Sequence, residues 1–139
     1  MATVLRELGS KRALVVSSRE GLDEISISSP TKISELKNGV ITTYDLTPED
    51  LGLRSYSLDE MLGGDAHTNA RIIERVLQGE RGAYRDVVLA NSGACIYVSG
   101  LADSIREGVQ IATQAIDSGK AMSQLERLIQ TTGEYSYVS

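Results

Sequence analysis

Residues 12–26 read RALVVSSREGLDEIS, where an apolar run passes through a polar turn into two adjacent carboxylates. A continuous apolar run such as residues 13–16 is typical of a strand buried on both faces of a parallel sheet. The sequence therefore predicts a central β-strand here. Since strand ends in α/β sheets commonly face ligands, the residues after this strand are the first candidates for a functional site.

The segments on either side of this strand also predict regular structure. Residues 4–8 have the apolar spacing of a short helix that ends at Gly9. Residues 31–36 and 40–46 are rich in β-forming residues, and Asn38-Gly39 between them is a strong hairpin signal because both positions tolerate positive φ. Residues 47–50, TPED, predict a helix start, with an early end at Gly52.

From Asp65 onward the apolar residues recur with the period of helices. Asp65 is placed to cap a helix whose apolar stripe consists of Ala66, Ala70, Ile73 and Leu77. Residues 84–100 are apolar nearly all round, which predicts a helix buried in the middle of the domain, with Asn91, Ser92 and Gly93 marking close packing or a ligand edge. Two terminal helices are predicted, one with Ile105, Val109, Ala112 and Ile116 on one face and one with Leu125, Leu128 and Ile129.

These elements together predict an α/β fold with a partial mixed or parallel sheet, a small antiparallel hairpin and a C-terminal cluster of helices. The length of 139 residues fits one domain, residues 1–139. A parallel sheet needs a second parallel strand, so we expect the chain to supply one side of a larger sheet. The last six residues, EYSYVS, alternate like a strand at a free end, and their structure is left open.

Composition narrows the classes of function. A net charge of −5 and a pI near 4.9 disfavour nucleic-acid binding, which needs clustered Lys and Arg. The sequence has no apolar run long enough to span a membrane and no signal-peptide pattern in residues 1–10, so we expect a cytoplasmic protein without membrane partners. Cys95 is the only cysteine, and its Ala-Cys-Ile setting predicts a buried thiol without chemistry.

Asp23 and Glu24 are the strongest candidates for a metal site, because they follow the predicted strand and a glycine. Adjacent side chains in a regular strand point to opposite faces, so both carboxylates can reach one metal only from a looped backbone, which Glu20-Gly21 permits. Such a pair suits Mg²⁺, because waters and substrate phosphates would complete the coordination shell of the ion. Judged by spacing alone, solvated loop charge is the more common explanation of an Asp-Glu pair.

Other polar features favour structural explanations. Gly63-Gly64 before a helix could present N–H groups to an anion, but Asp65 already offers a negative cap there and would repel a phosphate. His67 is the only histidine and is expected on the surface, and without a second histidine or a cysteine cluster zinc is excluded. No motif for a catalytic nucleophile occurs, so no catalytic residue is assigned.

Several of these segments, in order along the chain, resemble anthranilate phosphoribosyltransferases. The matching segments are residues 21–26 (GLDEIS), 29–31 (SPT), 35–36, 39, 44–53 (YDLTPEDLGL), 63–66 (GGDA), 69–70, 76–80 (VLQGE), 85–86, 91 and 116–121 (IDSGKA). The resemblance covers essentially the whole chain. It implies that the chain corresponds to the C-terminal part of that family's α/β domain, the domain that binds phosphoribosyl pyrophosphate.

What this resemblance implies is transfer of the 5-phosphoribosyl group from phosphoribosyl pyrophosphate to anthranilate, a step of tryptophan biosynthesis. In the family's pattern an Asp-Glu motif holds magnesium, and it matches Asp23 and Glu24. A divalent cation there would stabilise the departing diphosphate. The substrate-binding residues of this chain stay unassigned. Ser17-Ser18 stands where the family often has His-Gly.

The family's Gly-Thr-Gly-Gly-Asp phosphate loop, its Lys-His-Gly-Asn segment and its helical N-terminal domain do not occur in these 139 residues. We therefore expect a truncated or engineered C-terminal fragment that is inactive alone. Two alternatives stay open: a fragment of a related pyrimidine nucleoside phosphorylase, which residues 44–53 disfavour, and a non-catalytic folding or assembly module. The second predicts self-association through an exposed sheet edge or helix face.

Overall fold

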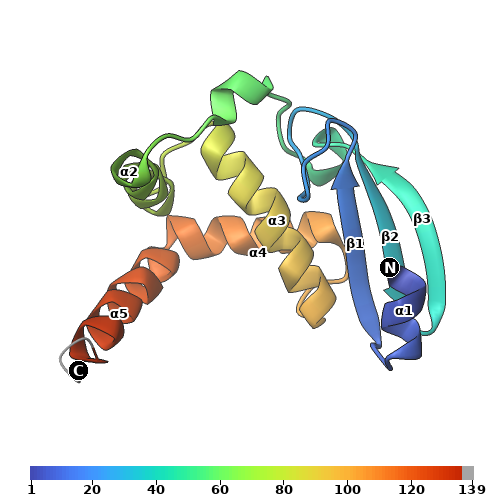
Figure 1. The fold of residues 1–139 in the computed structure, drawn as a ribbon. Helices are drawn as coiled ribbons and strands as arrows, with labels where there is room; N and C mark the ends of the chain where they lie inside the picture. Colours follow the sequence, from blue (N-terminus) through green and yellow to red (C-terminus); the bar gives the residue numbers. More distant parts are fainter. Residues whose placement is uncertain (136–139) are drawn as a thin grey trace.

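The computed structural model describes residues 1–135 and contains a small sheet, short 3₁₀ turns and a set of helices (Figure 1). The elements in chain order are α1 Ala2–Glu7, β1 Arg12–Ser18, β2 Thr31–Lys37, β3 Val40–Leu46, the 3₁₀ helices η1 Glu49–Leu51 and η2 Leu58–Met61, α2 Ala66–Leu77, α3 Ala83–Ser99, α4 Ile105–Asp117 and α5 Lys120–Tyr135. The predicted α/β class is confirmed. The alternation over the last six residues falls partly on residues 136–139, outside the described residues, while Glu134 and Tyr135 belong to α5.

Within the described residues the sheet is antiparallel throughout, with strand order β1-β2-β3, so the expected parallel component is absent from this part of the chain. The predicted hairpin of β2 and β3 is confirmed, since Asn38 and Gly39 join the strands with φ of 52° and 78°. The expectation of a central strand for residues 12–16 is wrong within the described chain: β1 pairs only with β2 and lies at the edge. An apolar run indicates that a strand packs against a core, but it does not indicate how many neighbouring strands pair with it.

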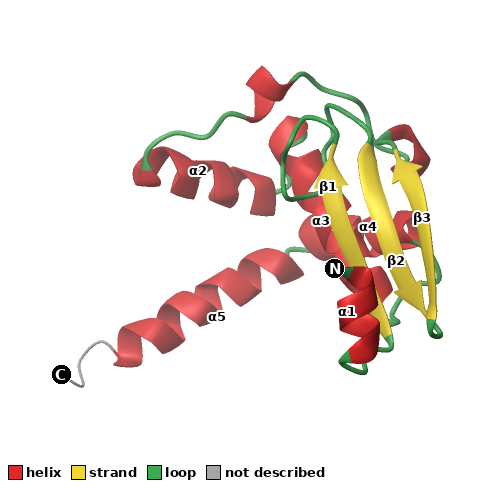
Figure 2. Cartoon of the chain, turned by 45° about the vertical axis from the view of Figure 1, so that its right-hand side comes forward, coloured by secondary structure: helices red, strands yellow, loops and turns green. Residues whose placement is uncertain are grey.

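Helices cover both faces of the sheet to different extents. Figure 2 shows α3 and α4 behind the sheet and the short α1 in front of it. The face toward α3 carries Ile33 and Leu46, which join the core with Leu14 and Val16 from β1. Leu36 lies on the other face, where α1 packs against β1 and β2. The main core therefore lies between the sheet and the α3–α4 pair.

The helices α3 and α4 cross with their backbones in contact at two glycines. A Cβ added to Gly108 would lie 2.2 Å from the carbonyl oxygen of Gly93, and one added to Gly93 would lie 2.7 Å from the backbone nitrogen of Val109. All four residues of the predicted stripe on α4, Ile105, Val109, Ala112 and Ile116, are buried. The absence of side chains at the crossing lets this stripe reach the core.

Tyr97 fastens α3 to the sheet through a polar cluster. Its hydroxyl donates to the carboxylate of Glu35, which also accepts a 3.0 Å hydrogen bond from the hydroxyl of Tyr44. Lys37 donates to the same Tyr97 hydroxyl at 3.2 Å, and the Arg12 guanidinium lies 4.7 Å from the centre of the Tyr97 ring. Burial, together with the negative charge of Glu35, raises the pKa of Tyr44. The cluster therefore joins all three strands to one helix.

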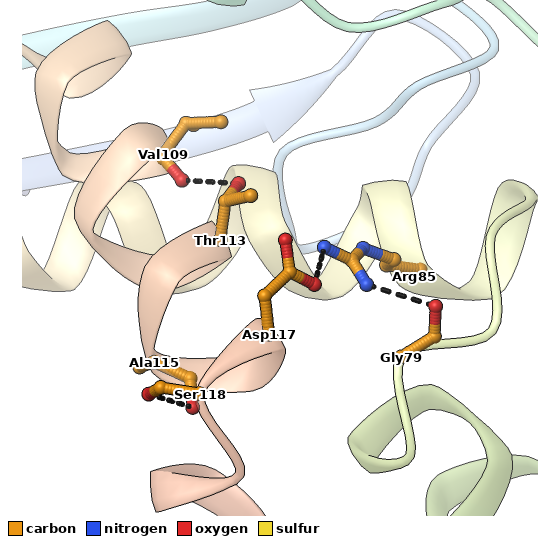
Figure 3. Close-up of polar contacts among 7 residues, drawn as sticks. All are labelled: Gly79, Arg85, Val109, Thr113, Ala115, Asp117 and Ser118. Atoms are coloured by element: carbon orange, nitrogen blue, oxygen red, sulfur yellow. Dashed lines mark hydrogen bonds and ion pairs between the residues drawn. The ribbon is translucent and has the colours of Figure 1, made fainter.

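Arg85 is the buried cation at the other end of α3 (Figure 3). Its Nη2 donates to the carboxylate of Asp117, at the end of α4, over 2.6 Å. Its Nη1 donates to the carbonyl of Gly79, just after α2, at 3.0 Å. One side chain thus ties together the ends of α2 and α4, because a buried charge is tolerated only with such partners.

The predicted helices α2 and α5 are confirmed, and most of their apolar stripes lie exposed within the described chain. Val76 is the buried residue of α2, whereas the side chain of Ile73 is 54% exposed. On α5, Leu128 is 60% and Ile129 is 61% exposed. The apolar period identifies a helix, and burial additionally needs a layer that covers it. Among the described residues, no helix is long and apolar enough to cross a membrane.

The glycine crossing gives a stability prediction. We expect Gly108→Ala to lower the free energy of unfolding by about 2 to 3 kcal/mol, because the new methyl group forces α3 and α4 apart. Gly133→Ala is the matched control, since that helical glycine has open space around it, and it should leave stability unchanged or raise it by up to about 1 kcal/mol. Urea unfolding followed by circular dichroism measures both. Equal effects of the two substitutions would contradict a tight crossing.

Candidate functional site

The loop between β1 and β2, residues 19–30 and here called the acidic loop, carries the predicted metal ligands. Ile25 and Ile27 point into the core and are almost completely buried, while Asp23 and Glu24 are exposed. The chain is looped here, with Gly21 at a φ of 95°, as a shared site for adjacent carboxylates requires. The two buried isoleucines fix the part of the loop that directly follows the carboxylates.

Ser18, the last residue of β1, organises the entrance of the acidic loop. Its backbone N–H donates to the carbonyl of Leu22 at 3.0 Å, and its Oγ accepts from the N–H of Leu22 at 2.8 Å. The N–H of Gly21 donates to the Ser18 carbonyl at 3.2 Å. Ser18 thus closes a tight turn immediately before Asp23. The Ser17-Ser18 pair is therefore compatible with an ordered loop.

Glu20, the third carboxylate of the loop, has a structural role. It accepts hydrogen bonds from the hydroxyls of Ser26 and Ser28. The N–H of Ser26 in turn donates to Oγ1 of the buried Thr31 at 2.9 Å. This network closes the return side of the loop. Glu20 is engaged internally, which distinguishes it from Asp23 and Glu24.

Asn91 on α3 binds the acidic loop through its side-chain amide. Its Oδ1 accepts from the N–H of Ile25 at 2.9 Å, and its Nδ2 donates to the carbonyl of Ile25 at 3.0 Å. Nδ2 also lies 3.4 Å from Oε2 of Glu24. The sequence indicated a ligand edge or close packing at residues 91–93, and the structure shows the close packing at Gly93. The sequence did not identify a specific partner for Asn91.

The carboxylate pair carries negative charge without a cation of its own. Within residues 1–135, neither Asp23 nor Glu24 forms an ion pair, and nearby Arg19 is paired with Asp45 at 2.6 Å. The same part of the chain brings no three His, Cys, Asp or Glu residues together as a metal cluster. Two carboxylates are a sufficient protein share for Mg²⁺, which keeps several waters and binds substrate phosphates. The hard oxygen donors of this pair therefore fit magnesium.

The segment between η1 and η2 also contacts the acidic loop. The N–H of Tyr56 donates to the carbonyl of Ile27 at 2.9 Å. Burial raises the pKa of Asp86 on α3, and this effect is opposed by a hydrogen bond from Tyr56 and by the backbone of Arg54. Burial of the Tyr56 hydroxyl, together with the charge of Asp86, raises the pKa of Tyr56. The acidic loop is thus contacted by β1, α3 and this segment.

An open groove of about 550 Å³ lies between β1 and α3 and reaches the acidic loop. Its wall is mainly apolar, with Leu14 and Val16 on one side and Ala94 and Val98 on the other. Cys95 also lines it and is exposed, so the prediction of a buried thiol is wrong. Cys95 lies on the flank of α3 that β1, as an edge strand, leaves uncovered.

The remaining candidates have structural roles. Asp65 accepts from the N–H of Thr68 at 2.8 Å and caps α2 as predicted. The N–H of Gly64 donates to Oδ1 of Asn69 at 2.8 Å, so this group is already satisfied without an anion. His67 is exposed on α2, as expected. The glycine pair is a turn that starts a helix.

Comparisons with known proteins agree with these features. Residues 1–122 match the model of the family described as "Glycosyl transferase family, a/b domain". The anthranilate phosphoribosyltransferase of Rubrobacter xylanophilus is 50% identical over 133 residues, which are 95% of this chain and 39% of that protein. The corresponding enzyme of Acetivibrio thermocellus is 42% identical over 97% of this chain and 39% of its own length.

Solved structures show the same likeness in three dimensions. The crystal structure of anthranilate phosphoribosyltransferase from Thermus thermophilus superimposes with a TM-score of 0.84 at 36% identity, over 93% of this chain and 38% of that one. The Saccharomyces cerevisiae enzyme in complex with PRPP and Mg gives 0.79 at 27% identity, over 88% and 36%. The chain spans less than two-fifths of the length of these relatives. With its α/β fold and its carboxylate loop, it belongs to the α/β domain of the glycosyl transferase family.

Proposed function

We propose that this chain, a single α/β domain, forms the magnesium-binding side of an anthranilate phosphoribosyltransferase active site. The observation that carries the proposal is the pair Asp23 and Glu24, exposed and without a cationic partner on a loop that is held at both ends. A relative that is 50% identical bears that enzyme's name, and the related yeast enzyme has a solved structure in complex with PRPP and Mg. Asp23 and Glu24 would hold the ion.

The reaction needs little covalent chemistry from the protein. The bond between ribose C1 and a diphosphate oxygen breaks, the amino nitrogen of anthranilate bonds to C1, and that nitrogen loses a proton. The diphosphate leaves with the electron pair of the broken bond, and Mg²⁺ bound to it would stabilise the charge that develops. The chain's own contribution is to orient Asp23 and Glu24 through the anchored loop.

The rest of the active site would come from outside this chain. The chain matches 39% of the length of its curated relatives, and positioning of both substrates supplies a large part of such catalysis. We therefore propose that the chain binds a magnesium diphosphate group but does not turn over anthranilate alone. The same proposal places it in the cytoplasm, as a piece of tryptophan biosynthesis.

Calorimetric titration of phosphoribosyl pyrophosphate into the purified chain tests this proposal. Binding is expected only when Mg²⁺ is present, and Asp23→Asn should weaken it by more than about 10-fold, since losing a ligand costs at least as much as losing a supporting partner. Asp103→Asn, an exposed carboxylate between α3 and α4, is the matched control and should bind like the parent chain. Binding that needs no Mg²⁺, or that survives Asp23→Asn, would contradict the assignment.

A second candidate function is a folding and assembly module, which the free edge of β1 favours. The outer edge of β1 has no neighbouring strand within the described chain, and the apolar groove beside it is open. An edge of this kind is a template for strand addition. The occupant we favour is a β-strand from the part of the relatives that this chain does not match, because that part is more than half of their length.

Co-expression with the unmatched part of the Rubrobacter relative tests this second candidate. A one-to-one complex is expected by light scattering, and Cys95→Glu should weaken it about 10-fold or more, since a charge would be buried in the groove. Val88→Glu, on an exposed part of α3 outside the groove, should have no effect. A homodimer that excludes the partner would instead indicate that a second copy covers the edge, and a lone monomer would contradict strand addition.

A further inference from the structure

The side-chain amide of Asn91 joins α3 to the acidic loop at the residue directly after the carboxylate pair. Both backbone groups of Ile25 are bound by it, the N–H by Oδ1 at 2.9 Å and the carbonyl by Nδ2 at 3.0 Å. Nδ2 also donates to the carbonyl of Val87, one helical turn earlier, at 3.0 Å. This last contact fixes the orientation of the amide on the helix.

The geometry leaves Glu24 only loosely engaged. A primary amide has two N–H groups, and the carbonyls of Ile25 and Val87 take both at normal distances. The contact of Nδ2 with Oε2 of Glu24 is 3.4 Å, longer than a typical N–H···O bond. Asn91 therefore fixes the backbone that carries Glu24, while the carboxylate remains available to a cation.

Burial of Ile25 alone does not set this geometry. The Ile25 side chain is fixed in the core, but a buried side chain leaves the direction of the preceding peptide groups undetermined. The paired hydrogen bonds from Asn91 fix the peptide groups on both sides of Ile25 and hence the exit direction of the chain at Glu24. Only a side chain with both an acceptor and donors makes this pair of bonds.

We infer that Asn91 is a positioning residue for a divalent cation at Asp23 and Glu24. The inference rests on the proposed function, in which these carboxylates hold Mg²⁺. In relation to that site Asn91 acts as an outer partner: it binds the backbone that carries Glu24 and makes only a long contact with one oxygen of the Glu24 carboxylate. Partners of this kind commonly change metal affinity by 10- to 100-fold when they are removed. A residue that only stabilised the fold would change stability without changing cation affinity.

The test uses Mn²⁺ as a paramagnetic probe for Mg²⁺, with free Mn²⁺ measured by electron paramagnetic resonance. Asn91→Ala is expected to weaken Mn²⁺ binding by about 10-fold or more. Cys95→Ala is the matched control, because Cys95 lies one turn further along α3, lines the same groove and makes no hydrogen bond to the loop. It should bind like the parent chain. Asn91→Ser keeps a polar group at this position and replaces the alanine variant if that one does not fold.

Hydrogen exchange of the Ile25 amide in the metal-free chain gives a second readout. We expect exchange to become about 10-fold faster in Asn91→Ala, which corresponds to the loss of a hydrogen bond worth about 1.4 kcal/mol. Unchanged exchange in a folded variant would overturn the role of Asn91 in holding the loop.

The two proposals fail in different ways. If the parent chain binds Mn²⁺, Asp23→Asn abolishes binding and folded Asn91→Ala binds equally well, the positioning role is overturned and the metal site stands. If the parent chain binds no Mn²⁺, the metal site itself is overturned, and the positioning role with it.

Discussion

The close crossing of α3 and α4 at Gly93 and Gly108 is the constraint on which the rest of the structure depends. With no Cβ on either residue, the carbonyl of Gly93 occupies space that any other side chain at residue 108 would fill. Close helix contact lets the stripe of α4 join the core that α3 shares with the sheet. The position of α3 relative to α4 is therefore set by backbone packing.

Three polar connections then use α3 as their common support. Arg85 near its start ties the ends of α2 and α4, Asn91 in its middle holds the acidic loop, and Tyr97 near its end binds the carboxylate of Glu35 in β2. Each connection is made by a partly or fully buried polar group, which is costly to leave unpaired. Displacing α3 would break all three, so the geometry of the carboxylate pair depends on a packing contact at the neighbouring glycines.

Much of the fold could be predicted from local patterns. Asn38-Gly39 specified the hairpin, Asp65 specified the start of α2, and the stripe of α4 specified its buried face, because each signal depends on residues close in sequence. The edge position of β1 and the exposure of Cys95 were mispredicted. Both depend on which elements lie beside β1, and an apolar run carries no information about them.

The candidate site was predictable only in part. Asp23 and Glu24 stood out by adjacency and by resemblance, and the looped backbone that a shared site needs is present. The residues that hold the loop were not predictable. Asn91 lies 66 residues from Ile25 in the sequence. Glu20 accepts hydrogen bonds from serines within the loop, and these serines look like ordinary loop residues in the sequence. Long-range contacts of single polar side chains leave no periodic trace in a sequence.

The account's central claim is that an α3-anchored loop presents Asp23 and Glu24 to a magnesium-bound diphosphate. Its most direct test is a map of backbone amide chemical shifts on adding Mg²⁺ and inorganic pyrophosphate to the uniformly labelled chain. The account predicts that the largest changes fall on residues 22–26, with little change in α5. Changes spread evenly over the surface, or confined to residues 63–65, would contradict it.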